Sequence, residues 1–229
     1  MNIKPKMIVW YFVDEVVSIF AMGVALFWSA GRLDWWAAWA AIAVQLVCMT
    51  ALGIVIIRFQ PGLMAERLMP PKGAKAWDRT IMSLMRLTQL ARYIIAGLDQ
   101  RYGWTAGFPV SVQIAACLGC VLGFALLEWA LASNAFFSQI VRIQSERGHT
   151  VARGGPYRFV RHPGYVGMVL FELAMPTLLD SGWALLVSGG CALLWIVRTA
   201  LEDRTLQAEL PGYAAYARQV RYRLIPGIW

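Results

Sequence analysis

Charged residues, and acidic ones above all, are scarce in this sequence. Its 229 residues include 21 Lys and Arg but only 13 Asp and Glu, and 59% of all residues are hydrophobic. A soluble domain is usually about 45–50% apolar and about 25% charged, so a charged fraction of 15% is too low for a water-exposed surface. The apolar residues gather in long runs, which predicts an integral membrane protein in a lipid bilayer.

Several common functional motifs are also missing. The sequence contains no P-loop, no GxGxxG motif and no serine-hydrolase elbow. His149 and His162 lack metal-ligand spacing, so we expect no metal site. The four cysteines lie inside apolar runs, which argues against a disulfide framework. The basic residues form no continuous face, so we expect no nucleic acid as a partner.

Five apolar runs are typical of membrane helices. They cover residues 7–30, 35–57, 108–137, 164–179 and 182–197. A spanning helix needs about 20 apolar residues. The last two runs are shorter, and a turn signal at 180–182 joins them, so we expect a helical hairpin there.

The segment 80–98 leaves two topologies open. It is apolar but carries Arg86 and Arg92, so it could lie along the membrane surface. The basic loop at 58–80 and the basic stretch at 142–161 both fit the cytoplasmic side, however, if 80–98 crosses. We therefore predict an all-α, multi-pass protein with five or six transmembrane helices. Residues 1–137 form its N-terminal helices, and residues 138–229 form a catalytic region with a pocket that faces the cytoplasm.

Polar residues concentrate at the two ends of the predicted hairpin. Pro163 can open a helix, and the start of a helix attracts carboxylate or phosphate groups. His162 precedes that start, and Arg198 follows the hairpin, so both return to one membrane face. A shared polar site follows from this placement. A helix start with arginines bound to lipid headgroups accounts for the same residues.

Carboxylates within the spans are further candidates. Glu202 lies four residues after Arg198, so the two share a helix face and could form a structural ion pair instead of a site. Glu172 follows Tyr165 by one or two turns and could face the same site. Asp14, Glu15 and Glu128 also lie within apolar runs and could line a cavity.

Two groups of residues form a recognisable pattern in the C-terminal region. The first joins Gly148-His149-Thr150-Val151, Gly155-Pro156-Tyr157 and Arg161-His162-Pro163-Gly164-Tyr165-(x)-Gly167. The second joins Arg198-(x)3-Glu202-Asp203 with Leu210-Pro211-Gly212-Tyr213 and Ile225-Pro226. Over about 138–229 the chain thereby resembles the isoprenylcysteine carboxyl methyltransferase family, part of a wider group with phospholipid N-methyltransferases. Its acidic pair is Glu-Asp where the family more usually has Glu-Glu.

The resemblance implies a cofactor, S-adenosylmethionine, and a set of site residues. Arg198 and Glu202 would be catalytic, and Arg198 would hold the acceptor. Glu172, by its spacing from Tyr165, is a further candidate contact to the acceptor. The implied cofactor contacts are Gln144, His149, Thr150, Val151, Ala152, Tyr157, His162, Pro163, Gly164, Tyr165 and Glu202.

The resemblance implies methylation of a lipidic or prenylated acceptor, and the reaction at a carboxylate is the leading hypothesis. A carboxylate is already ionised and needs no base, whereas N-methylation of a phospholipid or amine would need one, such as Glu172 or Glu202. A sterol-type reductase remains an alternative, because arginines could bind the 2′-phosphate of NADPH. A membrane scaffold without a cofactor is the third hypothesis.

Overall fold

The computed structural model describes residues 5–68 and 73–229, and this part of the chain folds into helices joined by turns and loops. Two short 3-10 turns, Ser145–Arg147 and Gly155–Arg158, interrupt the longest loop. The α-helices are α1 (Pro5–Ala30), α2 (Trp36–Phe59), α3 (Gly62–Leu68), α4 (Ala76–Tyr102), α5 (Val110–Ala132), α6 (Pro163–Leu178), α7 (Gly182–Glu209) and α8 (Tyr213–Gln219).

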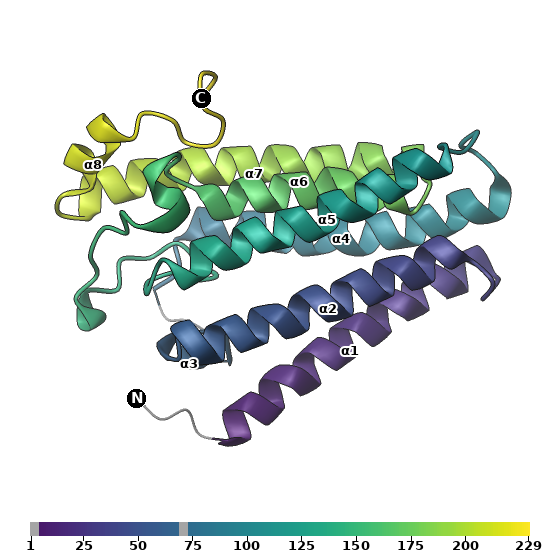
Figure 1. Cartoon of the computed structure of the whole chain (residues 1–229), viewed down its shortest axis with the longest axis horizontal. Helices are drawn as coiled ribbons and strands as arrows, with labels where there is room; N and C mark the ends of the chain where they lie inside the picture. Colours follow the sequence, from purple (N-terminus) through teal and green to yellow (C-terminus); the bar gives the residue numbers. More distant parts are fainter. Residues whose placement is uncertain (1–4, 69–72) are drawn as a thin grey trace.

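The longer helices lie lengthwise beside one another and alternate in direction (Figure 1). α3, α8 and the loop 133–162 all lie at one end of this bundle, on the left of Figure 1. We call these three segments the polar end. Because α2 ends and α4 begins there, the polar end gathers residues that are far apart in the sequence.

Four helices, α1, α2, α5 and α7, are long and apolar enough to cross a membrane. Their outward faces carry large apolar side chains; Phe20 is 72% exposed and Leu186 is 69% exposed. Exposed apolar residues on this scale fit lipid better than water. The prediction of an all-helical, multi-pass membrane protein is confirmed.

α4 is less apolar than these four, yet it packs within the bundle against α1 and α7. Its inward face carries the buried charged residues Asp78, Arg92 and Asp99. Arg198 pairs with Asp78 at 2.8 Å, and Ser181 donates to Asp99 at 2.5 Å. The polar side chains of α4 thus point to partners inside the protein, as charged residues in membrane helices usually do.

Two sequence-based boundaries were wrong. The run predicted over 108–137 is helical only to Ala132, because the chain turns there and the Asn134 side chain accepts from the backbone N–H of Phe136 at 2.9 Å. The loop predicted over 58–80 contains α3 and the first turn of α4. Residues 69–72 of that loop lie outside the described residues.

The helical hairpin is confirmed and is formed by α6 and α7. Pro163 occupies the first turn of α6, and the Ser181 hydroxyl caps α7 by accepting from the N–H of Ala184 at 3.0 Å. α6 lies close to α5 where Gly123 and Gly167 face each other, so that a Cβ on either would meet the backbone of the other helix. This contact fixes the start of α6 beside the polar end.

Candidate active site

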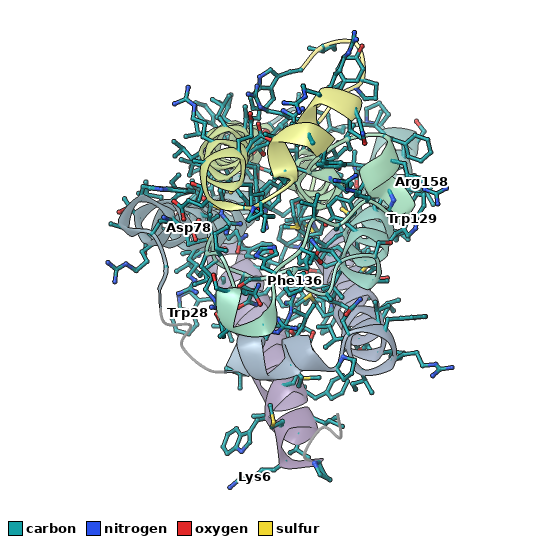
Figure 2. The ribbon with its side chains drawn as sticks, turned by 90° about the vertical axis from the view of Figure 1, so that its left-hand side faces the viewer. Lys6, Trp28, Asp78, Trp129, Phe136 and Arg158 are labelled. Carbon is teal, nitrogen blue, oxygen red and sulfur yellow. The ribbon has the colours of Figure 1, made fainter. Side chains whose placement is uncertain are left out.

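A cavity opens at the polar end between the loop 133–162 and the helices α6, α7 and α8. Viewed onto this end, Phe136 lies near the middle, between Asp78 on one side and Trp129 and Arg158 on the other (Figure 2). We call the cavity at this end the first cavity. Its lining residues are Asn134, Phe136, Phe137, Ser138, Ile140, Val141, Arg142, His149, Thr150, Val151, Ala152, Tyr157, Arg161, His162, Gly164, Tyr165, Glu202, Leu206, Leu210, Tyr213 and Tyr216.

The structure brings together most of the predicted cofactor residues in this cavity. Those that line it are His149, Thr150, Val151, Ala152, Tyr157, His162, Gly164, Tyr165 and Glu202. Pro163 is buried at the start of α6 and does not line it. Gln144 is also buried: its amide donates to the carbonyl of Phe136 at 2.9 Å, and its Oε1 accepts from Arg147 at 2.5 Å. Gln144 therefore stabilises the loop by these hydrogen bonds and does not line the cavity.

Asp203 holds the floor of the first cavity in place. This fully buried carboxylate accepts from Arg161 at 2.7 and 3.0 Å, from Arg223 at 2.9 Å and from the Tyr213 hydroxyl at 3.0 Å. Arg161 also donates to the backbone carbonyls of residues 220 and 221. Asp203 is the residue at which the acidic pair departs from the family's usual Glu-Glu, and here it ties the C-terminal segment to the loop.

Aromatic rings form much of the remaining wall. The rings of Phe136 and His149 stack with centroids 4.5 Å apart. Burial raises the pKa of Tyr157 above its usual range, and burial together with Asp203 does the same for Tyr213. Both hydroxyls therefore stay neutral near pH 7. The wall thus combines aromatic faces with neutral hydroxyl groups.

Glu202 and Arg198 do not pair with each other, although they are four residues apart on α7. The Tyr165 hydroxyl donates to Glu202, and the Arg198 Nε donates to Asp78 at 2.8 Å. Arg198 also donates to the carbonyl of Gln139 at 2.8 Å. The structural ion pair considered from the sequence is replaced by contacts to α6, α4 and the loop.

A second cavity adjoins the first and lies among the helices. Arg198 lines it, and its guanidinium carbon is 5.2 Å from the centre of the Tyr165 ring. Phe137, Ser138 and Tyr165 line both cavities. The second cavity, of about 330 Å3, is lined by Gln45, Met49, Leu52, Arg67, Met82, Met85, Arg86, Gln89, Arg92, Tyr93, Phe124, Leu127, Phe137, Ser138, Gln139, Tyr165, Met168, Phe171, Trp195 and Arg198.

Glu172 does not line either cavity. It is fully buried and pairs with Arg92, which also donates to the Tyr93 hydroxyl at 3.0 Å. The sequence placed Glu172 toward the ligand because of its spacing from Tyr165. In the structure Glu172 forms an ion pair with Arg92 instead. Arg92 lines the second cavity, and the sequence analysis did not assign it to the site.

Asp78 is a second residue that sequence reasoning missed. It is fully buried, pairs with Arg198 and accepts from the backbone N–H of Val141 at 2.8 Å. It therefore links α4, α7 and the loop that forms the first cavity. Its position at the start of a helix with no marked motif around it provides no local signal for this role.

Comparison with known proteins agrees with this geometry. Residues 114–208 match the model of the isoprenylcysteine carboxyl methyltransferase (ICMT) family. Among solved structures, the eukaryotic intramembrane Ras methyltransferase ICMT, determined without a monobody, is similar with a TM-score of 0.52 and 19% identity. The alignment covers 93% of this chain and 85% of that one. No curated protein matches the sequence.

The helical bundle has a polar cavity at one end and an adjoining cavity among its helices, and its fold is similar to that of the intramembrane Ras methyltransferase ICMT. The match over 114–208 covers α6, most of α5 and α7, and most of the residues that line the first cavity. Over residues 114–208 the chain is similar to the isoprenylcysteine carboxyl methyltransferase family, and over most of its length its fold is similar to that of an ICMT structure.

Proposed function

We propose that this protein transfers a methyl group from S-adenosylmethionine to the carboxylate of a lipidic or prenylated acceptor. The first cavity holds the cofactor, and the second cavity holds the acceptor. The observation that carries the proposal is the meeting of the two cavities at Tyr165, with Glu202 on the first side and Arg198 on the second. Two ligands held in this way meet end to end, as a direct transfer requires.

The residues of the first cavity fit the proposed cofactor. Its sulfonium is a cation, and the cavity offers the aromatic faces of Tyr157 and Tyr165. Glu202 can accept hydrogen bonds from an amino group or ribose hydroxyls. At the start of α6 the N–H groups of Tyr165 and Val166 donate to the carbonyl of His162 at 3.0 and 3.3 Å, which leaves the N–H of Gly164 for a carboxylate. When bound, S-adenosylmethionine would supply an activated methyl group.

The residues of the second cavity fit a carboxylate acceptor better than an amine. Its described lining includes four arginines and no carboxylate. Glu172 is paired with Arg92, and Glu202 lines the first cavity and not the second, so neither is placed to act as a base on an amine in the second cavity. Arg198 uses Nε and Nη2 within the protein and keeps Nη1 for a ligand. Orientation and exclusion of water would supply most of the catalysis.

The reductase alternative finds less support at the first cavity. Its two lining arginines, Arg142 and Arg161, form ion pairs with Glu146 at 2.7 Å and Asp203 at 2.7 Å. A 2′-phosphate would compete with both carboxylates. We therefore expect the protein to prefer S-adenosylmethionine over NADPH.

The proposed topology has six crossings, with α4 and α6 completing the set. The alternating direction of the helices supports this number, because each of the six would then cross the membrane in the opposite sense to the helix before it (Figure 1). The basic residues of the loop 133–162 and of the C-terminus lie together at the polar end. By the positive-inside rule we infer that the polar end faces the cytoplasm.

Binding and transfer assays test the proposal. We would purify the full chain in detergent and measure binding of S-adenosylmethionine and of NADPH by calorimetry. Transfer of a labelled methyl group to an S-prenylated cysteine carboxylate, compared with an S-prenylated amine, would then identify the acceptor group. Binding of NADPH without binding of millimolar S-adenosylmethionine would overturn the proposal, and methylation of only the amine would overturn its carboxylate part.

A further inference from the structure

Two of the three guanidinium nitrogens of Arg198 are already bonded within the protein. Nε donates to Asp78 at 2.8 Å, and Nη2 donates to the carbonyl of Gln139 at 2.8 Å. Nε and Nη2 form one edge of the guanidinium, and arginine often uses such an edge to hold both oxygens of a carboxylate by two parallel hydrogen bonds. An acceptor cannot take this edge while Asp78 holds Nε.

The third nitrogen, Nη1, is the atom of Arg198 that a ligand can reach. It makes no hydrogen bond with any described residue. Arg198 is only 2% exposed, yet its Nη1 is not among the buried unpaired atoms of the described residues, so Nη1 keeps some accessible surface. Because Arg198 lines the second cavity, an acceptor there meets the guanidinium at Nη1.

Asp78 holds the guanidinium in this orientation. It is fully buried in the first turn of α4, and its second oxygen accepts from the backbone N–H of Val141 at 2.8 Å. The guanidinium carbon lies 5.2 Å from the centre of the Tyr165 ring and 5.5 Å from that of Trp195. The guanidinium therefore cannot turn its Nε–Nη2 edge toward the cavity without losing the ion pair with Asp78.

The way in which a carboxylate is held affects its reactivity. In the proposed transfer, a lone pair of one carboxylate oxygen forms the new bond to the methyl carbon. The pair of the broken carbon–sulfur bond stays on sulfur, and no proton moves. An oxygen that accepts a hydrogen bond from arginine is a weaker nucleophile than a free one. A contact to one oxygen orients the acceptor and leaves the other oxygen free to react.

We propose that Asp78 is a positioning residue, which occupies Nε of Arg198 so that Nη1 holds one oxygen of the acceptor carboxylate and the other oxygen stays free. This inference rests on the proposed function, because it takes the second cavity as the acceptor site. It applies to lipidic and prenylated acceptors alike, since both present a carboxylate. Asp78 lines neither cavity and acts through Arg198.

Infrared spectroscopy of a bound acceptor tests this contact without turnover. We would bind S-prenylated N-acetylcysteine with an isotope-labelled carboxylate to the full protein in nanodiscs, in the absence of cofactor. A carboxylate held by one oxygen has unequal carbon–oxygen bonds, which separates its antisymmetric and symmetric stretches more widely than in the guanidinium salt of the same ligand. We expect the wider separation. A separation equal to that of the salt would overturn the inference.

Asp78→Ala frees Nε and should allow Arg198 to hold both oxygens. We expect the separation of the two stretches to fall toward that of the salt. The acceptor should bind about threefold to tenfold more tightly, as one added hydrogen bond allows. The kcat should fall about tenfold or more, because the reacting oxygen is no longer free or correctly placed. Weaker acceptor binding with an unchanged separation would contradict the positioning role.

Asp99→Ala is the matched control on the same helix. Asp99 is also buried and lines neither cavity, and it accepts from Thr105 and Ser181 near the other end of α4. Its loss should lower the thermal midpoint, because buried donors lose their acceptor, but should not change the separation of the stretches. The same spectral change in both variants would overturn the inference. If Asp78→Ala does not fold, the spectrum of the unchanged protein still decides.

The test also separates this inference from the proposed function. If the prenylated carboxylate is methylated but its bound spectrum matches the salt, the inference is wrong and the proposed function stands. If S-adenosylmethionine fails to bind, the proposed function is wrong. A wide separation that is lost in Asp78→Ala would then still support Asp78 as the residue that sets how Arg198 holds a carboxylate.

Discussion

The two cavities share Tyr165 but differ in how many of their charged groups are paired within the protein. In the first cavity Arg161 is paired with Asp203, and Glu202 accepts from Tyr165. In the second, Arg67 and Arg86 form no ion pair with any described side chain. The first cavity is thus preorganised by the protein itself, as suits one invariant cofactor. The second cavity leaves these two arginines without an ion-pair partner, as suits a cavity that receives an anionic acceptor.

Removal of the Asp203 carboxylate should have the largest effect on the first cavity, on both its stability and its binding of the cofactor. Asp203→Ala leaves Arg161 without its buried partner and releases the C-terminal segment from the first cavity. Loss of one partner of a buried ion pair typically costs about 3–5 kcal/mol. We expect a large fall in the thermal midpoint in detergent and loss of S-adenosylmethionine binding.

A surface pair provides the control for this prediction. Glu209 and Lys75 pair at 2.6 Å, but both side chains are substantially exposed. Exposed pairs contribute about 0–1 kcal/mol. Glu209→Ala should therefore leave the thermal midpoint and cofactor binding nearly unchanged. Similar losses in the two variants would contradict the role given to Asp203.

The contact between α5 and α6 should affect both cavities together. Gly167→Ala would place a Cβ against the backbone of Gly123, and overpacking of this kind costs about 1–3 kcal/mol. Because α6 carries Tyr165, we expect weaker binding of both cofactor and acceptor, together with a lower thermal midpoint. Gly190→Ala is the matched control, since a Cβ there meets no atom within 4 Å and should stabilise α7 by about 0.5–1 kcal/mol.

The sequence alone was sufficient to predict the long apolar helices, the hairpin and nine of the residues that line the first cavity. A long apolar run indicates a membrane helix by its length alone, and His149, Tyr157 and His162 belong to one short motif. What failed were roles that depend on a partner elsewhere in the fold. Glu172 has suitable spacing from Tyr165, but Arg92 on α4 neutralises it.

The sequence of α4 contains a periodic pattern of buried residues that its mean hydropathy does not reveal. Asp78, Met85, Arg92 and Asp99 recur every seven residues, which places them on one helix face, and all four are buried. The charged members of that face lower the mean hydropathy of a helix that lies inside the bundle. The periodicity could have indicated an inward polar face. The partners on α6, α7 and the loop depend on tertiary packing and could not be predicted from it.

Conservative changes at Glu202 and Arg198 should separate the two cavities. Glu202→Gln removes a charged acceptor from the first cavity, and we expect the dissociation constant for S-adenosylmethionine to rise about tenfold or more. Arg198→Lys keeps a positive charge beside Asp78 but loses the planar fork. It should raise the KM for the acceptor and leave cofactor affinity unchanged. Equal loss of cofactor affinity in both variants would contradict the division between the cavities.

The smallest expected effect is a pH dependence confined to the first cavity. Burial, with Arg147 and Arg142 nearby, lowers the pKa of His149 below its ordinary value of about 6.5, while Glu146 opposes the shift. The neutral ring accepts from the backbone N–H of Gln144 at 3.2 Å, and a protonated ring could not. Above pH 6.5 the ring is neutral whether the protein is folded or unfolded, so its contribution is complete.

As the pH falls below 6.5, the unfolded chain takes up a proton that the folded loop resists, so stability and cofactor affinity should both decrease. We expect S-adenosylmethionine to bind about threefold to tenfold more weakly at pH 5 than at pH 7.5. His149→Asn keeps an acceptor that does not titrate and should flatten this dependence, as measured by calorimetry across the range. An undiminished slope in His149→Asn would assign the effect to another group. The same substitution should not change the binding of lipid carboxylates in the second cavity, whose described lining contains no histidine.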